Sequence, residues 1–195
     1  MELIFQDKKR IIDEPSAKII IETINDWLGK EYYFSHLVAD GLLIYEETEK
    51  FLASELESID KLEVIGRKPE ELKSELLLSA EQYIKRSLPE LIILSDHFYN
   101  TPKQETWNQF EDMLEGMQWL NQLITSIDGL KIRPKNWNEY LTIAASLENE
   151  LKKLEEAMRN EDHVLTGDII QYEIEPIYQL LQSAIKQSID DEGMR

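Results

Sequence analysis

The chain has 195 residues, of which 42% are hydrophobic, and its 39 acidic and 21 basic side chains give a net charge of −18. This hydrophobic content is enough for a true core, while the absence of cysteine excludes disulfides, thiolate metal sites and cysteine nucleophiles. The acidic excess repels phosphate groups, so we expect neither nucleic acid nor a membrane among the partners.

The N-terminal segment predicts a β-hairpin followed by a helix. Two short β-prone runs, residues 2–6 and 10–13, flank the polar sequence Asp7-Lys8-Lys9, which we interpret as the turn. Pro15-Ser16 then precedes a segment in which apolar residues recur on one helical face. Gly29 follows this segment in the usual position of a C-terminal cap.

Residues 32–46 admit two interpretations. Aromatic and branched residues flank Asp40-Gly41, and an Asp-Gly pair signals a hairpin because a type I′ turn needs positive φ angles. A helix is the alternative, since five apolar residues also fall on one helical face: Phe34, Leu37, Val38, Leu42 and Tyr45. We favour the hairpin because aromatic residues are enriched in strands.

A short helix at residues 51–56 and a strand at residues 61–65, ending at Gly66, complete the N-terminal part. We therefore expect a small α+β unit of up to five strands and two helices in residues 1–68.

From Pro69 onwards the pattern changes to long amphipathic helices. The first begins at Pro69, with Glu70 and Glu71 at the positive end of its dipole, and its apolar stripe continues to Phe98. Pro89 lies within this stripe. An interior proline removes a backbone hydrogen bond and displaces the carbonyl four residues before it, so we expect a kink or a break there.

Three further helices are expected. One follows Pro102, and the next begins at Asn136, with Glu139 three residues on as in a capping arrangement. The last, residues 163–189, contains Pro176. Four amphipathic segments joined by short loops favour an antiparallel bundle.

The predicted fold class is therefore α+β and predominantly helical. We expect two domains: residues 1–68 form a sheet-and-helix unit with hairpins, which packs on an antiparallel bundle of about four helices in residues 69–195. The junction between them is where we expect a groove or a subunit contact.

The three histidines, His36, His97 and His163, are the only imidazoles of the chain, and three such ligands could hold a catalytic zinc. Each lies in a different element and none forms an HxxxH or HExxH pair, so we favour no metal site and expect no cofactor. The Glu-x-x-His motif of a di-iron bundle is missing. The sequence also lacks a GxSxG elbow and a glycine-rich phosphate loop, so nothing in it supports an enzymatic reaction.

Pro89 and Pro176 raise the hypothesis of a groove in the bundle. Kinks at the two prolines would open a space between helices that suits an apolar ligand or a partner helix. The simpler interpretation, which we favour, is that the prolines only curve the helices around the α+β unit. The hypothetical groove would be lined by Tyr83, Leu88, Tyr172 and Ile177.

Trp119 is a candidate for an interface. Trp107 fits the apolar stripe of its helix, whereas Trp119 lies beside Leu120 and cannot share that residue's direction. We therefore expect Trp119 to face away from the main core, against the α+β unit or a partner, since exposed aromatic side chains tend to anchor contacts.

These features favour a non-catalytic protein–protein interaction or assembly module. It would bind a protein partner or self-associate, through the edge of its small sheet or an apolar face of the bundle. The net charge favours a solvated surface and, as a second interpretation, a basic partner. The alternative function is a small-molecule binder or a metal-dependent enzyme at the junction of the two units, with His36 and His97 nearby.

We expect a cytoplasmic protein. Cysteine is absent, the first residues do not resemble a signal peptide, and no apolar run is long enough to span a membrane.

Overall fold

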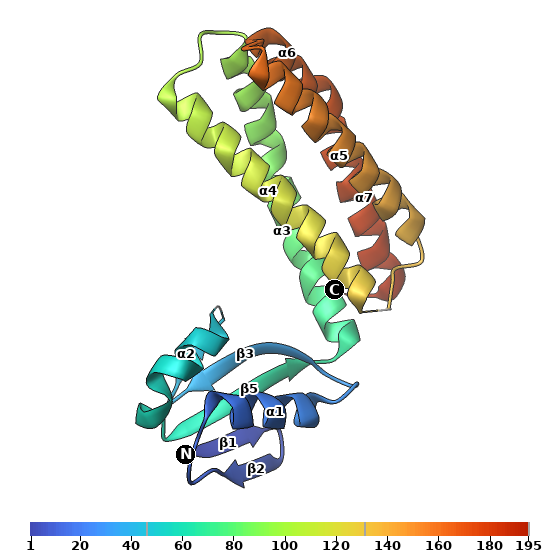
Figure 1. Ribbon diagram of the computed structural model, residues 1–195. Coiled ribbons are helices and arrows are strands. Elements are labelled where there is room, and N and C mark those ends of the chain that lie inside the picture. The colour runs from blue at the N-terminus through green and yellow to red at the C-terminus, as the bar shows by residue number, and fades with distance from the viewer. Residues whose placement is uncertain (46, 131, 195) are drawn as a thin grey trace. The chain divides into compact units, whose positions relative to one another are not determined.

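The computed structural model describes residues 1–45, 47–130 and 132–194 of the chain. The chain divides into two compact units, one ending at Leu72 and the other beginning at Lys73 (Figure 1). All strands of the described residues lie in the first unit, and long helices form the second. The predicted fold class, α+β and predominantly helical, is therefore confirmed.

The N-terminal unit is built on one mixed sheet with the strand order β2-β1-β5-β3-β4. β1 and β5 run parallel, and the other neighbouring strands are antiparallel. Two hairpins thus flank β5, which lies at the centre of the sheet. The strands are β1 (Glu2–Phe5), β2 (Lys8–Ile11), β3 (Tyr33–Ala39), β4 (Leu42–Ile44) and β5 (Lys61–Arg67).

The hairpin predicted for residues 32–46 is confirmed, and the helical alternative is wrong. Its turn has Asp40 at φ 47° and Gly41 at φ 90°, the positive angles that the Asp-Gly pair predicted. Glu46, the last residue of that range, lies outside the described residues.

The first hairpin is also confirmed, but its turn is shorter than predicted. Phe5 pairs with Lys8, so Gln6 and Asp7 make the turn in place of Asp7-Lys8-Lys9. The two lysines belong to the edge strand β2, where charged residues are common because they discourage pairing with other chains.

Two helices cover the same face of the sheet, α1 (Ala17–Leu28) and α2 (Thr48–Glu55), the second continued by a 3₁₀ turn, Leu56–Ser58 (Figure 1). Ser16 caps α1, since its Oγ accepts a hydrogen bond from the Ile19 N–H at 3.3 Å. The helices and the sheet share one buried core, made of Leu3, Phe5, Ile12, Ile20, Ile24, Leu28, Leu37, Ala39, Leu52, Leu56, Ile59, Leu62 and Val64.

Gly66 lies within β5 and does not end it, because Arg67 still pairs with Tyr33. A Cβ atom at Gly66 would lie 2.8 Å from Cδ2 of Leu28 and 2.9 Å from Cε2 of Phe5. The missing side chain therefore lets α1 pack close to the sheet, which is why the strand tolerates a glycine here.

The second unit is a bundle whose helical segments, within the described residues, lie lengthwise beside one another (Figure 1). Short loops reverse the chain direction between successive segments, so the bundle is antiparallel. Three segments are single helices, and the fourth is a composite of two helices and a π-helical turn. They are α3 (Pro69–Phe98), α4 (Gln104–Gly129), α5 (Trp137–Arg159) and the composite of α6 (His163–Ile169), η2 (Ile170–Ile174) and α7 (Glu175–Glu192).

The two prolines inside the predicted helices are accommodated differently. We expected a kink or a break at Pro89. It lies within α3, which continues on both sides of it, so the helix does not break there. Pro176 stands at the start of α7, directly after η2. Proline cannot donate the N–H of a regular turn, and the wider π turn lets the chain continue past that missing bond. The fourth predicted helix is therefore two helices joined by this turn.

The start of α5 is tied to α7 by a buried hydrogen-bond network. Asn136 precedes α5, but its side chain does not make the predicted capping bond. Its Nδ2 instead donates to the Ala184 carbonyl at 3.0 Å, and its Oδ1 accepts from Ser188 Oγ at 2.7 Å. Ser188 Oγ also lies 2.8 Å from Tyr140 Oη. Because the serine proton goes to Asn136, the tyrosine hydroxyl donates to Ser188.

Candidate functional site

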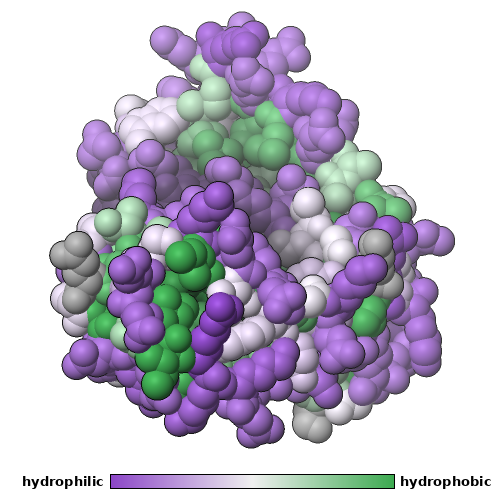
Figure 2. All heavy atoms as spheres, turned by 60° about the horizontal axis from the view of Figure 1, so that its bottom comes forward, coloured by the Kyte–Doolittle hydropathy of each residue, from purple (hydrophilic) through white to green (hydrophobic). Residues whose placement is uncertain are grey.

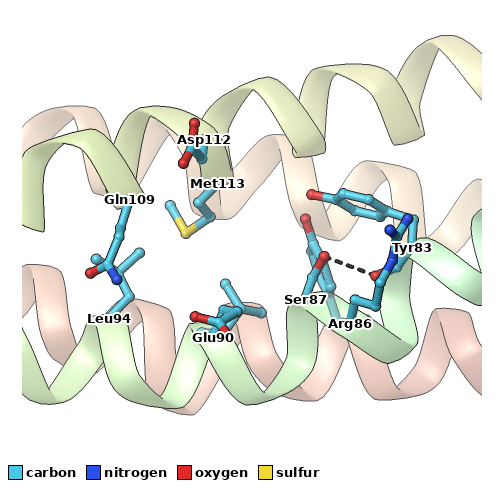
Figure 3. A pocket seen from close by; sticks show the side chains of 10 residues that line it. Tyr83, Arg86, Ser87, Glu90, Leu94, Gln109, Asp112 and Met113 are labelled. Carbon is cyan, nitrogen blue, oxygen red and sulfur yellow. Dashed lines mark hydrogen bonds between the residues drawn. The ribbon is translucent and has the colours of Figure 1, made fainter. Parts of the chain in front are cut away.

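The bundle has a pocket between α3 and α4, to which α7 contributes one residue (Figure 3). Its volume is about 380 Å³, more than twice the roughly 150 Å³ of an apolar cavity that accepts benzene. The lining residues are Tyr83, Arg86, Ser87, Glu90, Leu91 and Leu94 of α3, Gln109, Asp112 and Met113 of α4, and Tyr178 of α7.

The inner wall of the pocket is apolar. Leu91, Leu94 and Met113 are buried residues of the bundle core. The thioether of Met113 reaches into the space between the two helices, and the ring of Tyr83 closes one end (Figure 3). On α3 and on α4 the lining residues recur about every three or four positions, because one face of each helix meets the pocket.

Tyr178 contributes a polar atom to this apolar wall. Its side chain is 0% exposed, and its hydroxyl has no hydrogen-bond partner among the described residues. Burial raises the pKa of Tyr178 above its usual value, and the neighbouring Tyr83 raises it further. The Tyr178 hydroxyl therefore stays neutral at ordinary pH and can donate or accept one hydrogen bond.

Charged side chains stand at the rim of the pocket. Arg86, Glu90 and Asp112 are exposed, and none of the three forms an ion pair within the described part of the chain. The Arg86 Nε donates to the Gln82 carbonyl at 3.3 Å, which holds the guanidinium along its own helix. The rim thus carries two carboxylates and one guanidinium.

Gly116 of α4 shapes the pocket by allowing the ring of Tyr83 to pack against the helix. A Cβ atom at Gly116 would lie 1.5 Å from Tyr83 Oη and 2.5 Å from Tyr83 Cζ, so no side chain fits there while Tyr83 keeps its position. A glycine costs a helix interior about 1 kcal/mol relative to alanine. The space taken by Tyr83 is what requires Gly116 despite that cost.

Trp119 lies beside this arrangement. Its side chain is 36% exposed, and its ring centroid is 5.1 Å from that of Tyr83. The indole therefore packs against the tyrosine that closes one end of the pocket. A partner for Trp119 stays a prediction.

Among the residues predicted to line a groove, only Tyr83 lines the α3–α4 pocket. Leu88 is half-buried against the bundle core, and Ile177 is buried within that core. Tyr172 is 64% exposed and lines a separate hollow together with Leu165. The structure therefore does not bring these four side chains to one place.

Most residues of the pocket were not singled out from the sequence. The polar ones, such as Arg86 and Asp112, lie at the edge of the apolar stripes, where charged residues are ordinarily solvated and carry no specific signal. Gly116 did carry one, because a glycine inside an amphipathic helix often marks a close approach of another group. Tyr178 could be found only from the structure, since its missing partner is a property of the packed core.

The three histidines lie in different surroundings. His36 of β3 has its Nδ1 3.1 Å from Ser35 Oγ and its ring 4.5 Å from that of Tyr45. His97 has its Nδ1 3.0 Å from Gln109 Oε1. His163 lies 5.7 Å from the ring of Trp107. Within the described residues, no three histidine, aspartate or glutamate side chains form a group that could hold a metal ion.

A second surface lies at the edge of the N-terminal sheet. Among the described residues β4 pairs only with β3, so the outer backbone edge of β4 is open. Leu42, Leu43 and Tyr45 are 62%, 53% and 61% exposed. Next to them is a groove of about 410 Å³ between β4 and α2, to which Phe51 contributes. Hydrophobic side chains also form a patch among hydrophilic ones on the face of this unit seen in Figure 2.

The chain is thus a two-unit α+β protein with a pocket in its helical bundle and an open strand edge in its sheet unit. A family model described as a domain of unknown function, DUF8042, matches residues 75–184, more than half of the chain, so the chain belongs to this family. The matched residues include every residue that lines the α3–α4 pocket. No curated protein and no solved structure matches the chain. In the described residues no helix is long and apolar enough to cross a membrane.

Proposed function

We propose that the chain is a non-catalytic protein-interaction module whose N-terminal unit binds an extended segment of a partner protein along β4. The observation that carries this proposal is the open edge of β4 with three exposed apolar side chains, Leu42, Leu43 and Tyr45, beside it. An extended segment added to such an edge gains backbone hydrogen bonds from the strand and apolar contacts from the side chains.

The register of β4 supports apolar contacts on both faces of an added strand. Leu42 pairs with Ala39, and Ile44 pairs with Leu37. Because Ala39 and Leu37 belong to the helix-covered core, Leu42 and Ile44 point to that face of the sheet, whereas Leu43 points to the opposite face. A partner segment would therefore place side chains in the groove that Leu43, Ile44 and Phe51 line.

Charge supports a basic partner segment. Residues 1–68 contain 15 acidic and 9 basic side chains, and the whole chain carries −18. A segment with alternating apolar residues and flanking lysine or arginine is attracted by this field, whereas a second copy of the chain is repelled by it. The same field supports our exclusion of nucleic acids and anionic membranes as partners.

Selection from a displayed library of random peptides tests the proposal. We expect the selected peptides to alternate apolar residues and to carry basic ones, and their binding to slow hydrogen exchange of the amides in β4. Leu43→Asp should abolish binding. Leu180→Asp is the matched control, because Leu180 is 61% exposed on the bundle. Peptides that bind equally to both variants would overturn the proposal.

Light scattering tests the competing occupant, a second copy of the chain. We expect a monomer, since the like charges of two acidic copies oppose association. A dimer that dissociates in Leu43→Asp would show that β4 joins two copies and would overturn the choice of a basic partner.

We place this module in the cytoplasm. The absence of cysteine supports this location, because the cytoplasm keeps thiols reduced and folds there are stabilised by packing. Fractionation of cells that express the chain checks it, and recovery in an oxidising compartment would contradict it.

A further inference from the structure

We propose that the pocket between α3 and α4 binds a small organic cation with an apolar body, such as an arylalkylammonium ion. This site goes beyond the interaction at β4, because it uses different residues in the other unit. Three features of the pocket support this ligand: the unpaired hydroxyl, the apolar wall and the charges of the rim.

The unpaired hydroxyl of Tyr178 indicates a missing ligand atom. Buried polar groups are nearly always hydrogen-bonded, and an unpaired one is costly to keep. Tyr178 lines the pocket and is 0% exposed, and its hydroxyl forms no hydrogen bond of normal geometry in the described part of the chain, although Tyr83 lies close enough to raise its pKa. An ammonium N–H placed in the pocket would donate to the Tyr178 oxygen.

The apolar wall indicates the rest of the ligand. Leu91, Leu94 and Met113 present hydrocarbon and a thioether to the pocket, and sulfur makes favourable contacts with aromatic rings. The ring of Tyr83 adds an aromatic surface at one end (Figure 3), where a cation is attracted to the π system. A flat apolar group with an attached ammonium combines both contacts.

The rim favours a positive ligand over a negative one. Glu90 and Asp112 outnumber Arg86, and the described residues offer none of them an ion-pair partner. The surrounding chain carries −18, so the field at the pocket mouth attracts cations. A carboxylate ligand could pair with Arg86, but it would face both carboxylates of the rim as well.

Methionine-methyl NMR of the full chain tests the site. The chain has five methionines, and Met113→Leu identifies the Met113 signal. Three probes share one aromatic body and differ in charge: phenethylammonium, phenethyl alcohol and phenylacetate. We expect phenethylammonium to shift the Met113 signal in a saturable way, with an affinity at least about tenfold above that of the alcohol, one charge-assisted contact being about that large. Phenylacetate should leave the signal unchanged.

Substitutions at exposed positions test the charges without disturbing the core. Glu90→Gln and Asp112→Asn should each weaken binding of phenethylammonium several-fold. Glu111→Gln is the matched control: it removes an exposed carboxylate of α4 that does not line the pocket, and binding should not change. Tyr178→Phe should weaken binding, whereas Tyr172→Phe, outside the pocket, should not.

Three results would overturn the proposal. Equal affinity for the alcohol and the ammonium ion would remove the role of charge. Tight binding of phenylacetate that is lost in Arg86→Gln would assign the pocket to anions. Absence of any Met113 shift with all three probes at millimolar concentration would show that the pocket binds no such ligand. None of these results depends on the outcome of the peptide selection at β4.

Discussion

Tyr140 and Tyr178 are both fully buried in the bundle core, yet only Tyr140 has a hydrogen-bond partner among the described residues. Tyr140 donates to Ser188, within a network that ties the start of α5 to α7. Tyr178 lies on the wall of the α3–α4 pocket with its hydroxyl unpaired. Burial raises the pKa of both hydroxyls, so both stay neutral.

The difference distinguishes a region whose buried tyrosine hydroxyl is hydrogen-bonded within the chain from one whose buried tyrosine hydroxyl is not. The Tyr140 hydroxyl finds its partner inside the chain, in a network that also pairs Ser188 with Asn136. At Tyr178 the chain leaves a polar atom and an adjacent space, which is costly unless a ligand or water occupies it. The same residue type in one core therefore indicates a structural role in the first place and a binding role in the second.

Ser188→Ala disrupts the hydrogen-bond network around Tyr140 and has the largest expected effect. It removes the acceptor of the Tyr140 hydroxyl and the donor to Asn136 Oδ1. The buried Tyr140 hydroxyl and the half-buried Asn136 amide then lose a partner, so we expect a loss of about 3 kcal/mol in the free energy of unfolding. Ser183→Ala is the control, because Ser183 is exposed and, among the described residues, its hydroxyl donates a hydrogen bond only to the Gln179 carbonyl of its own helix. Urea unfolding followed by circular dichroism measures both, and equal stabilities would contradict the network's role.

Gly116→Ala should disrupt the α3–α4 pocket by forcing Tyr83 away from α4. The overlap with Tyr83 Oη, 1.5 Å from the added Cβ, is too large for small adjustments. We expect a loss of about 2 kcal/mol from overpacking, partly offset by the higher helix propensity of alanine. Gly129→Ala is the matched control on α4, since its Cβ would meet nothing within 4 Å. Near-ultraviolet circular dichroism should report the movement of Tyr83 past Trp119, and an unchanged spectrum would contradict the prediction.

Alkaline pH sharpens the comparison because it acts on both buried tyrosines. Their pKa values are raised in the folded chain, so their neutral forms stabilise the fold fully below the unfolded pKa of about 10. As the pH rises above 10, the unfolded chain loses these protons and the folded chain keeps them, so stability falls. Each tyrosine should contribute roughly 1.4 kcal/mol per pH unit. Unfolding at pH 9 and pH 11 measures the slope, which Tyr140→Phe and Tyr178→Phe should each reduce.

The elements of the fold could be predicted from the sequence because their signals are local. The Asp40-Gly41 turn and the Gly29 cap depend on residues within a few positions, and both occur as predicted. Asn136 shows the limit: its sequence context favours a cap, but its side chain bonds to Ser188, which is 52 residues away. A local pattern cannot reveal such a competing partner.

The pocket was less predictable for the same reason. The sequence predicts Tyr83 as a groove residue from its place near Pro89, but the pocket also has side chains from α4 and α7. Which residues face one another across helices depends on how the ridges of one helix fit the grooves of the next. No spacing within one helix contains that information. The missing partner of Tyr178 is even harder to predict from the sequence, because it depends on every neighbour of that hydroxyl.

Replacing each tyrosine by phenylalanine compares the two regions most directly, with the smallest expected effects. Tyr140→Phe should cost about 1 kcal/mol, because Ser188 loses a partner that the folded chain supplies. Tyr178→Phe should leave the free energy of unfolding unchanged or raise it slightly, because an unpaired buried hydroxyl is removed. Urea unfolding of the ligand-free chain measures the two variants together. A loss at Tyr178 as large as that at Tyr140 would mean that the chain itself satisfies this hydroxyl, and the contrast between the two regions would disappear.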